Sequence, residues 1–422
     1  MKKLLVYLKT YKKETILAPL FKMLEALFEL FVPLVIAAII DTGIENKDVP
    51  YIVRMAIVLV VLAIVGLTCS LTAQYFSAKA AVGFAAKLKS ALFAHIESLS
   101  FKEIDTLGTS TLITRMTSDI NQVQSGVNLV LRLFLRSPFI VFGAMIMAFT
   151  IDVKAALIFV VAIPLLAIVV FGIMLVSIPL FKKVQGALDS VLGITRQNLT
   201  GVRVIRAFNN EQSEIENFDE KNAVLTGLQK FVGKISALMN PVTFIIVNGA
   251  IAALIWVGAL RVDAGILSQG QVVALVNYMS QILVELVKLA NLIITVTKAV
   301  ACGNRIQSVF EIKSSMEEGS RRYSASSEDD YSIEFKNVNL CYNEGADSSL
   351  TGIDFSVRKG ETVGIIGGTG SGKSSLVGLI PRFYDATQGQ VLVDGVNVNE
   401  YSFDELREHV GIVMQKAVLF KG

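Results

Sequence analysis

Six apolar runs dominate the first three-quarters of the sequence. A helix needs about 20 consecutive apolar residues to cross a bilayer, and each run is close to that length or longer. The runs cover residues 16–40, 53–71, 133–150, 155–178, 241–260 and 272–294. The pattern therefore predicts six membrane-spanning helices, and an even number of spans puts both chain ends on the same side of the membrane.

Basic residues are unevenly distributed between the two sides of these runs. The loops after the first, third and fifth runs are short and hold few of them, namely Lys47, Lys154 and Arg261, whereas the N-terminus and the other connections are rich in lysine and arginine. Cytoplasmic loops carry the excess of Lys and Arg, so we expect a multi-pass protein of the cytoplasmic (inner) membrane with both termini in the cytoplasm. The basic N-terminus is similar to that of a signal peptide, but the run after it lacks a convincing cleavage site and is predicted to remain as the first span.

Two long connections on the cytoplasmic side are predicted to be helices rather than loops. Residues 73–99 contain no proline and repeat apolar residues at helical spacing, and residues 181–208 follow a similar pattern. The first stretch would extend the second span by about 40 Å beyond the membrane. Such helices can carry motion between a soluble domain and the spans, and helical hairpins without a mechanical role are the alternative.

The composition supports a membrane protein and argues against a nucleic-acid partner. Hydrophobic residues make up 53% of the 422 residues and the mean hydropathy is +0.59, which exceeds the apolar share of ordinary soluble domains. The net charge of +3 is small, and the basic residues are spread along the chain. The cysteines, Cys69, Cys302 and Cys341, have no metal-ligand spacing and are predicted to be unpaired packing residues.

The sequence changes character at residues 314–330, which contain almost no apolar residue and predict a flexible linker. We therefore expect a transmembrane domain at 1–313 and a soluble domain at 331–422. In the soluble part, alternation of apolar and polar residues predicts a strand at 331–340, and a short apolar run predicts a buried strand at 363–366.

Two local signals predict further elements of the soluble domain. Asp394 and Gly395 stand between apolar residues, as the turn of a β-hairpin does. Ser402 and Glu405 have the spacing of a capping box, which predicts a short helix after Ser402.

The most specific motif of the chain is a glycine-rich loop with the spacing G-x-x-x-x-G-K-S, set between the predicted strand 363–366 and a helical run. The loop consists of Gly367, Gly368, Thr369, Gly370, Ser371, Gly372, Lys373 and Ser374. Its glycines allow backbone N–H groups to face phosphate oxygens, Lys373 is expected to neutralise the β- and γ-phosphates, and Ser374 to ligate Mg²⁺. The alternatives are a glycine-rich turn without a ligand and a dinucleotide-binding loop, although the latter needs no Lys-Ser pair.

Together with this loop, several segments resemble the ATP-binding cassette (ABC) exporters of the multidrug and lipid type, in which a membrane domain precedes a nucleotide-binding domain. The resemblance covers essentially the whole chain. The segments are FVPLVIAAIIDTGI, TLITRMTSDINQVQ, LTGVRVIRAFNNEQSEIENF, NLCYNEG and GIVMQKAVLF. The resemblance implies a membrane all-α domain of six helices followed by an incomplete α/β P-loop nucleotide-binding domain.

The same resemblance assigns nucleotide contacts to residues near the loop and beyond it. It implies that Tyr342 stacks on adenine and that Ser375 belongs to the ATP site. It also implies that Gln415 contacts Mg²⁺ together with Ser374, because a neutral amide oxygen can ligate the ion.

The activity implied by the resemblance is ATP-driven export of a hydrophobic or amphipathic small molecule, lipid or peptide. The exporter is expected to be a half-transporter that dimerises with an identical or related chain in membrane lipid, with ATP and Mg²⁺ as cofactors. Segments 106–112 and 209–217 are implied to contact nucleotide-binding domains. A non-catalytic or regulatory subunit of a heterodimer and an ATP-gated channel are the alternatives.

Three motifs of the family do not occur before Gly422: the signature motif, the strand that ends in Asp-Glu, and the switch histidine. We therefore expect this chain alone not to hydrolyse ATP, with Lys373 as its one predicted contributor to transition-state stabilisation, and assign ATP hydrolysis to the intact version. Without neighbouring strands, Ile365 and Ile366 are expected to lack part of their apolar cover.

Several ionisable residues fall within the predicted spans, where a charge is costly and often functional. They are Lys22, Glu25 and Glu29 in the first span and Glu285 and Lys288 in the sixth. These residues are candidates for a substrate cavity. However, the i, i+3 spacing of Lys22 with Glu25 and of Glu285 with Lys288 also predicts simple ion pairs, and pairing is the preferred interpretation.

Overall fold

The structure is a computed structural model that describes residues 2–322, 331–342 and 347–415. The chain divides into two compact units whose boundaries fall inside continuous helices. One unit consists of Lys2–Ala86 and Asn121–Ala301, and the other of Lys87–Ile120 and Cys302–Gly422.

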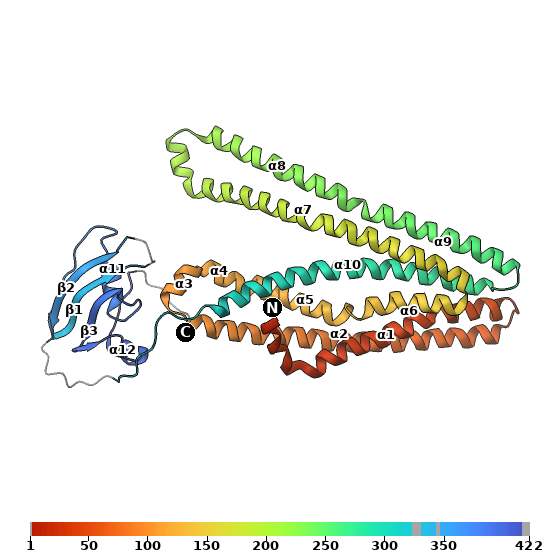
Figure 1. Cartoon of the computed structure of the whole chain (residues 1–422), viewed down its shortest axis with the longest axis horizontal. Coiled ribbons are helices and arrows are strands. Elements are labelled where there is room, and N and C mark those ends of the chain that lie inside the picture. The colour runs from red at the N-terminus through yellow and green to blue at the C-terminus, as the bar shows by residue number, and fades with distance from the viewer. Residues whose placement is uncertain (1, 323–330, 343–346, 416–422) are drawn as a thin grey trace. The chain divides into compact units, whose positions relative to one another are not determined.

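Among the described residues, six helical stretches are long and apolar enough to cross a membrane, which confirms the six predicted spans (Figure 1). The first stretch contains the 3₁₀ segment η1 (Lys2–Tyr11), α1 (Lys12–Ala38) and the π-helical segment η2 (Ile39–Ile44), and the second is α2 (Val49–Glu97). The third contains α4 (Thr109–Thr114), η3 (Arg115–Asp119), α5 (Ile120–Leu133) and α6 (Arg136–Ile151). The last three contain α7 (Val153–Ala207), α8 (Glu211–Ala237) with α9 (Met239–Asp263), and α10 (Gln269–Glu311).

Small side chains let the membrane helices approach one another closely. Buried alanines of α6, α7 and α10 pack with larger apolar residues; they are Ala144, Ala148, Ala155, Ala156, Ala162 and Ala274. In lipid there is no hydrophobic force between helices, so close van der Waals packing has to hold them. Tyr278 of α10 is fully buried, and its hydroxyl donates a hydrogen bond of 2.6 Å to the carbonyl of Leu30, which ties α10 to α1.

Helices α2 and α7 continue well past the predicted spans, as expected for residues 73–99 and 181–208. The 55 residues of α7 correspond to a length of about 80 Å. The Asp152 side chain caps the start of α7 by accepting a hydrogen bond of 2.8 Å from the Ala155 amide. After a turn that includes Asn209 in the left-handed region, α8 runs back beside α7 (Figure 1).

An antiparallel sheet forms the core of the soluble part of the other unit. Its strands are β1 (Tyr331–Leu340), β2 (Leu350–Arg358), β3 (Gln388–Val393) and β4 (Val396–Asn397), in the order β2-β1-β3-β4. Phe335 and Phe355 stack across β1 and β2 with ring centroids 4.7 Å apart. Two short helices, α11 (Lys373–Leu379) and α12 (Phe403–His409), bury Leu376, Leu379 and Leu406 in the same apolar cluster.

The predicted hairpin turn is present, and so is the Ser402 half of the predicted capping box, while the Ser402 amide donates to the Arg321 carbonyl at 3.2 Å. Asp394 and Gly395 join β3 to β4 with positive φ at both positions, as a type I′ turn requires. The Ser402 hydroxyl accepts a hydrogen bond from the Glu405 amide at the start of α12.

The prediction of a buried strand at 363–366 is wrong. The segment has no strand structure, and Ile366 is 98% exposed. A short apolar strand of this kind needs neighbouring strands to pair with its backbone and cover its faces, and no described strand lies beside it. The expectation that Ile365 and Ile366 lack apolar cover is thereby confirmed, since Ile365 is exposed as well.

Candidate functional site

The glycine-rich loop takes backbone conformations that only glycine adopts readily. Gly370 and Gly372 have φ values of +84° and +86°, and α11 begins directly after them at Lys373. A Cβ atom on Gly372 would lie 2.9 Å from the carbonyl oxygen of Ser349. The loop therefore depends on glycine at this point both for its φ angle and for its close approach to the chain before β2.

The ammonium group of Lys373 lies over the loop. Its Nζ donates hydrogen bonds of 2.7 Å to the carbonyl oxygens of Gly367 and Gly368, and it also contacts the Ser371 hydroxyl. The residue is half-buried, but the hydrogen bonds of its ammonium group lie in exposed surroundings, so the positive charge is accessible to an anion. A mobile cation, backbone amides of a glycine loop and the Ser374 hydroxyl are the groups that hold the phosphates and the Mg²⁺ of a bound nucleotide. The residues present thus fit a nucleoside triphosphate.

Tyr342 lies next to the phosphate loop. Its hydroxyl donates a hydrogen bond of 2.8 Å to the Ser375 hydroxyl in α11. Its ring stands at 88° to the ring of Tyr384, with centroids 4.9 Å apart. The structure therefore brings together two predicted site residues, Tyr342 and Ser375, and adds Tyr384 to them.

Tyr384 links this site to the short helix α3 (Phe101–Leu107), which follows α2 in the chain and belongs to the same unit. The Tyr384 hydroxyl donates a hydrogen bond of 2.6 Å to the carboxylate of Asp105. The Phe101 ring packs on the Phe383 ring at 4.7 Å. The contact with α3 thus lies at Phe101 and Asp105, slightly before the expected segment 106–112.

The surroundings of this contact shift two acid–base equilibria. Burial, followed by the hydrogen bond to the Asp105 carboxylate, raises the pKa of Tyr384 well above its usual value. Burial opposes ionisation of Glu103 in α3, but hydrogen bonds from Ser100 and Ser315 outweigh it and hold the pKa of Glu103 below its usual range. Both shifts favour the protonation states that keep α3 hydrogen-bonded.

The sequence did not identify Tyr384 or Asp105 as site residues. The weak signal was an aromatic pair, Phe383 and Tyr384, shortly after the helix that follows the phosphate loop. Gln415 is exposed near the end of the described residues, and within the described ranges no contact joins it to Ser374. Its Mg²⁺ role stays a prediction, as does the nucleotide-domain contact of segment 209–217.

The ionisable residues of the spans form the expected pairs. The Lys22 ammonium lies 2.5 Å from the Glu25 carboxylate, and the Lys288 ammonium lies 2.8 Å from the Glu285 carboxylate. Arg136, at the start of α6, is a charged residue of this region that the sequence did not identify. Among the described residues the cysteines form no disulfide, as predicted; they are Cys69, Cys302 and Cys341.

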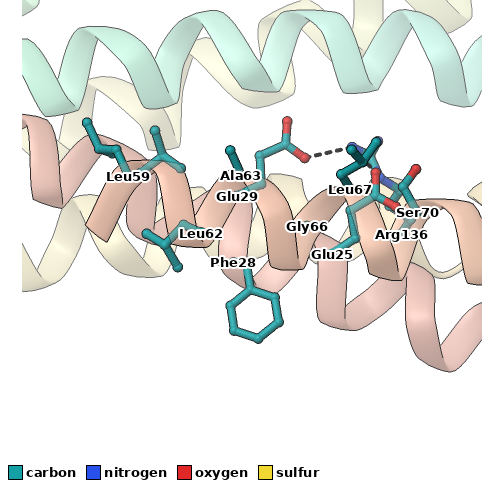
Figure 2. Close-up of a pocket in the computed structure, with 11 residues that line it drawn as sticks. Glu25, Phe28, Glu29, Leu59, Leu62, Ala63, Gly66, Leu67, Ser70 and Arg136 are labelled. Atoms are coloured by element: carbon teal, nitrogen blue, oxygen red, sulfur yellow. Dashed lines mark hydrogen bonds and ion pairs between the residues drawn. The ribbon is translucent and has the colours of Figure 1, made fainter. Parts of the chain in front are cut away.

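Arg136 connects the ion pairs of α1 and α10. Its guanidinium donates to Glu29 at 2.7 Å and to Glu285 at 2.6 Å. Figure 2 shows the contact with Glu29, beside side chains of α2. Mutual pairing of this kind satisfies charges that would otherwise be costly between apolar helices.

Comparison with known proteins identifies the two parts of the chain. The family model of the ABC transporter transmembrane region matches residues 15–286, and that of the ABC transporter family matches residues 350–422. An uncharacterised ABC transporter ATP-binding protein of Mycobacterium tuberculosis is 32% identical over 99% of this chain and 72% of its own length. A probable multidrug resistance ABC transporter ATP-binding/permease protein of Bacillus subtilis is 30% identical over 75% of this chain and 47% of its own. An ATP-dependent lipid A-core flippase of Desulfotalea psychrophila is 30% identical over 74% of this chain and 54% of its own.

Proposed function

This chain belongs to the ABC transporter family, and we propose that it exports hydrophobic or amphipathic substrates from the cytoplasm, driven by ATP. The names of two relatives support this class, since one is a probable multidrug resistance transporter and the other a lipid flippase. The observation that carries the proposal is the continuous contact from the phosphate loop through Tyr342 and Tyr384 to Asp105. This contact connects an ATP-binding loop to a helix that follows a membrane span.

We propose specific roles for the residues at the loop. Lys373 and the loop amides would hold the phosphates, Tyr342 would stack on the adenine, and Ser375 would keep Tyr342 in place through its hydroxyl. Ser374 and Gln415 would ligate Mg²⁺, which when bound neutralises charge between the β- and γ-phosphates. The hydrogen bonds of the Lys373 ammonium lie in exposed surroundings, which supports this role, because a flexible ammonium can leave the Gly367 and Gly368 carbonyls for a phosphate oxygen.

The contact at α3 suggests how nucleotide binding is passed on. Phe101 and Asp105 hold α3 to Phe383 and Tyr384 by one ring contact and one charge-assisted hydrogen bond. A movement of the Tyr342 ring on nucleotide binding would press on Tyr384, against which it stands edge to face. We propose that α3 follows this movement and transmits it to α2.

We infer that the end of the α7–α8 hairpin contacts a second half-transporter. Phe208, in the turn between these helices, is 79% exposed, and Leu199 and Ile215 beside the turn are exposed as well. A cluster of apolar side chains beyond the predicted spans is costly in water unless another surface covers it. We propose that a second chain covers this end of the hairpin, and that both chain termini lie in the cytoplasm, where the basic connections lie.

Lys373→Ala in the full-length protein tests the proposed function. Loss of the ammonium removes the charge that holds the phosphates, so ATP-dependent accumulation of a lipophilic dye in inside-out vesicles should disappear, together with retention of a labelled ATP analogue. Lys359→Ala is the matched control, because Lys359 is an exposed lysine of the same domain outside the loop. Export that persists in the Lys373 variant would overturn the proposal.

A further inference from the structure

Six charged side chains of α1, α6 and α10 form one network, and most of them are fully engaged. Glu285 accepts from Arg136, from the Ser137 hydroxyl at 2.7 Å and from Lys288. Lys22 donates to Glu25 and to the Ser70 hydroxyl. A carboxylate can accept about four hydrogen bonds, so Glu285 uses most of its capacity within the protein.

Glu29 is the exception in this network. Among the described residues, Arg136 is its hydrogen-bond donor and reaches one of its two oxygens at 2.7 Å. Its side chain is 40% exposed, whereas those of Glu25 and Glu285 are 16% and 3% exposed. Glu29 therefore presents a carboxylate with unused acceptor capacity at a place where the other acidic groups are covered.

This carboxylate faces a cavity of about 490 Å³ between α1 and α2. Leu59, Leu62, Ala63 and Gly66 of α2 line this cavity together with Glu29 (Figure 2). The remaining lining is also mainly apolar, apart from Glu25, Ser70 and Arg136. Cavities of roughly 300 to 1,000 Å³ with apolar walls and a few polar groups are typical of small-molecule sites.

The charge at this cavity is negative. Two carboxylates and one guanidinium line it. Glu25 is paired with Lys22 and the Arg136 side chain is only 8% exposed, so the accessible charge is that of Glu29. The exposed ammonium of Lys288 lines a second cavity, of about 330 Å³, which Glu29 also lines. An organic cation with apolar groups fits the α1–α2 cavity, whereas the Glu29 carboxylate would repel an anion of the same shape.

We propose that Glu29 is the binding residue for the cationic group of an amphipathic substrate, whose apolar part lies against α2 in this cavity. The inference rests on the proposed export function and names its substrate class. In a low-dielectric site, a carboxylate attracts an organic cation more strongly than it does in water. Arg136 keeps Glu285 as a partner at 2.6 Å when Glu29 turns to the substrate, so no buried charge is left alone.

The test compares tetraphenylphosphonium with tetraphenylborate, which have nearly the same shape and opposite charge. Binding of each ion to the purified full-length protein is measured by equilibrium dialysis. Glu29→Gln should weaken tetraphenylphosphonium binding by about tenfold or more, which corresponds to about 1.4 kcal/mol, and should not weaken tetraphenylborate binding. Glu29→Asp retains the charge and should restore most of the affinity.

Two further variants separate charge from shape. Lys288→Gln removes a side chain of similar exposure, 42%, from the same network but from the other cavity, and should leave tetraphenylphosphonium binding within about twofold. Gly66→Leu fills the proposed cavity, because a Cβ at Gly66 would meet no atom within 4 Å. It should weaken the binding of tetraphenylphosphonium and of neutral triphenylphosphine oxide alike.

The outcomes distinguish this inference from the proposed function. Unchanged tetraphenylphosphonium binding in a Glu29→Gln protein with an unaltered melting temperature would overturn the inference, and so would an equal loss for both ions. ATP-dependent transport of triphenylphosphine oxide in such a protein would leave the export function standing. Conversely, charge-selective binding without ATP-coupled transport of any probe would keep the site and refute export.

Discussion

The hydroxyl of Tyr384 joins the nucleotide-binding part of the chain to helix α3 through one hydrogen bond of 2.6 Å to Asp105. Asp105 is exposed, so solvent weakens this bond, and we expect it to be worth no more than about 1 kcal/mol. We expect this hydrogen bond to contribute to coupling between the two sites more than to stability. Because the phenol points from the edge of the Tyr342 ring to α3, its loss should uncouple the two sites without unfolding either.

Tyr384→Phe should therefore reduce the stimulation of ATPase activity by substrate severalfold, with ATP affinity within about twofold of the original. Tyr331→Phe, at the start of β1, is the control for loss of a phenol hydroxyl elsewhere in the same domain. The readout is the ratio of substrate-stimulated to basal ATPase activity of the full-length protein in proteoliposomes. An unchanged ratio would show that the hydroxyl does not contribute to coupling.

The contribution of Tyr384 to the stability of the folded protein depends on pH, because the pKa of Tyr384 is raised. A group whose pKa is raised in the folded protein stabilises it fully below the unfolded pKa, which is about 10 for tyrosine. That contribution is lost only as the pH rises above this value. The difference in the free energy of unfolding between the original protein and Tyr384→Phe should therefore be constant from about pH 6 to pH 9.

Residues of the site differed in how far the sequence could predict them. Lys373 and Ser374 follow from spacing alone, because the chemistry of a phosphate loop is contained in eight consecutive residues. Tyr384 and Asp105 are 279 positions apart, and no local pattern relates two residues at such a distance. Arg136 was missed for the same reason, since its partners lie on two other helices.

Glycine at position 372 determines whether the phosphate loop and α11 can form together. The residue has φ of +86°, and a Cβ would approach the Ser349 carbonyl oxygen to 2.9 Å. Gly372→Ala should cost about 1–3 kcal/mol of local stability, because a left-handed residue with a side chain is strained and the clash adds to it. The loop and the start of β2 should both be displaced.

Gly364→Ala is the matched control for this change. Gly364 stands just before the loop, has no positive φ, and a Cβ there would meet no atom within 4 Å. Hydrogen exchange of α11 should accelerate in the Gly372 variant and stay unchanged in the Gly364 variant. Equal exchange in the two variants would contradict the strain argument.

Whole elements were predictable where their pattern was long and their environment was simple. The helices 73–99 and 181–208 were expected because helical periodicity over many turns leaves little ambiguity, and α2 and α7 contain them almost entirely. The strand at 363–366 failed because a short apolar run becomes a strand only when neighbours pair with it. The prediction of the turn at Asp394 and Gly395 is confirmed, because a type I′ turn requires only positive φ at two neighbouring residues.

At the scale of the whole molecule, the end of the α7–α8 hairpin is the surface where a second chain should bind. Phe208 is its most exposed aromatic residue, and large aromatic side chains contribute strongly when they are buried at the centre of an interface. A charge at this position would have to be desolvated on association. In the full-length protein, Phe208→Asp should therefore weaken dimerisation and lower ATPase activity at least about tenfold, as expected for a loss above about 1.4 kcal/mol.

Ser213→Asp provides the control, because it adds the same charge to an exposed position of α8 in the same hairpin. Light scattering of the purified protein, taken over a range of concentrations, measures the dissociation constant, and ATPase assays at the same concentrations show whether activity follows the dimer. A Phe208 variant that dissociates while the Ser213 variant stays dimeric supports a hairpin that is covered by the partner. If both variants remain dimeric and active, the exposed apolar end of the hairpin is not the interface, and association has to depend on another surface.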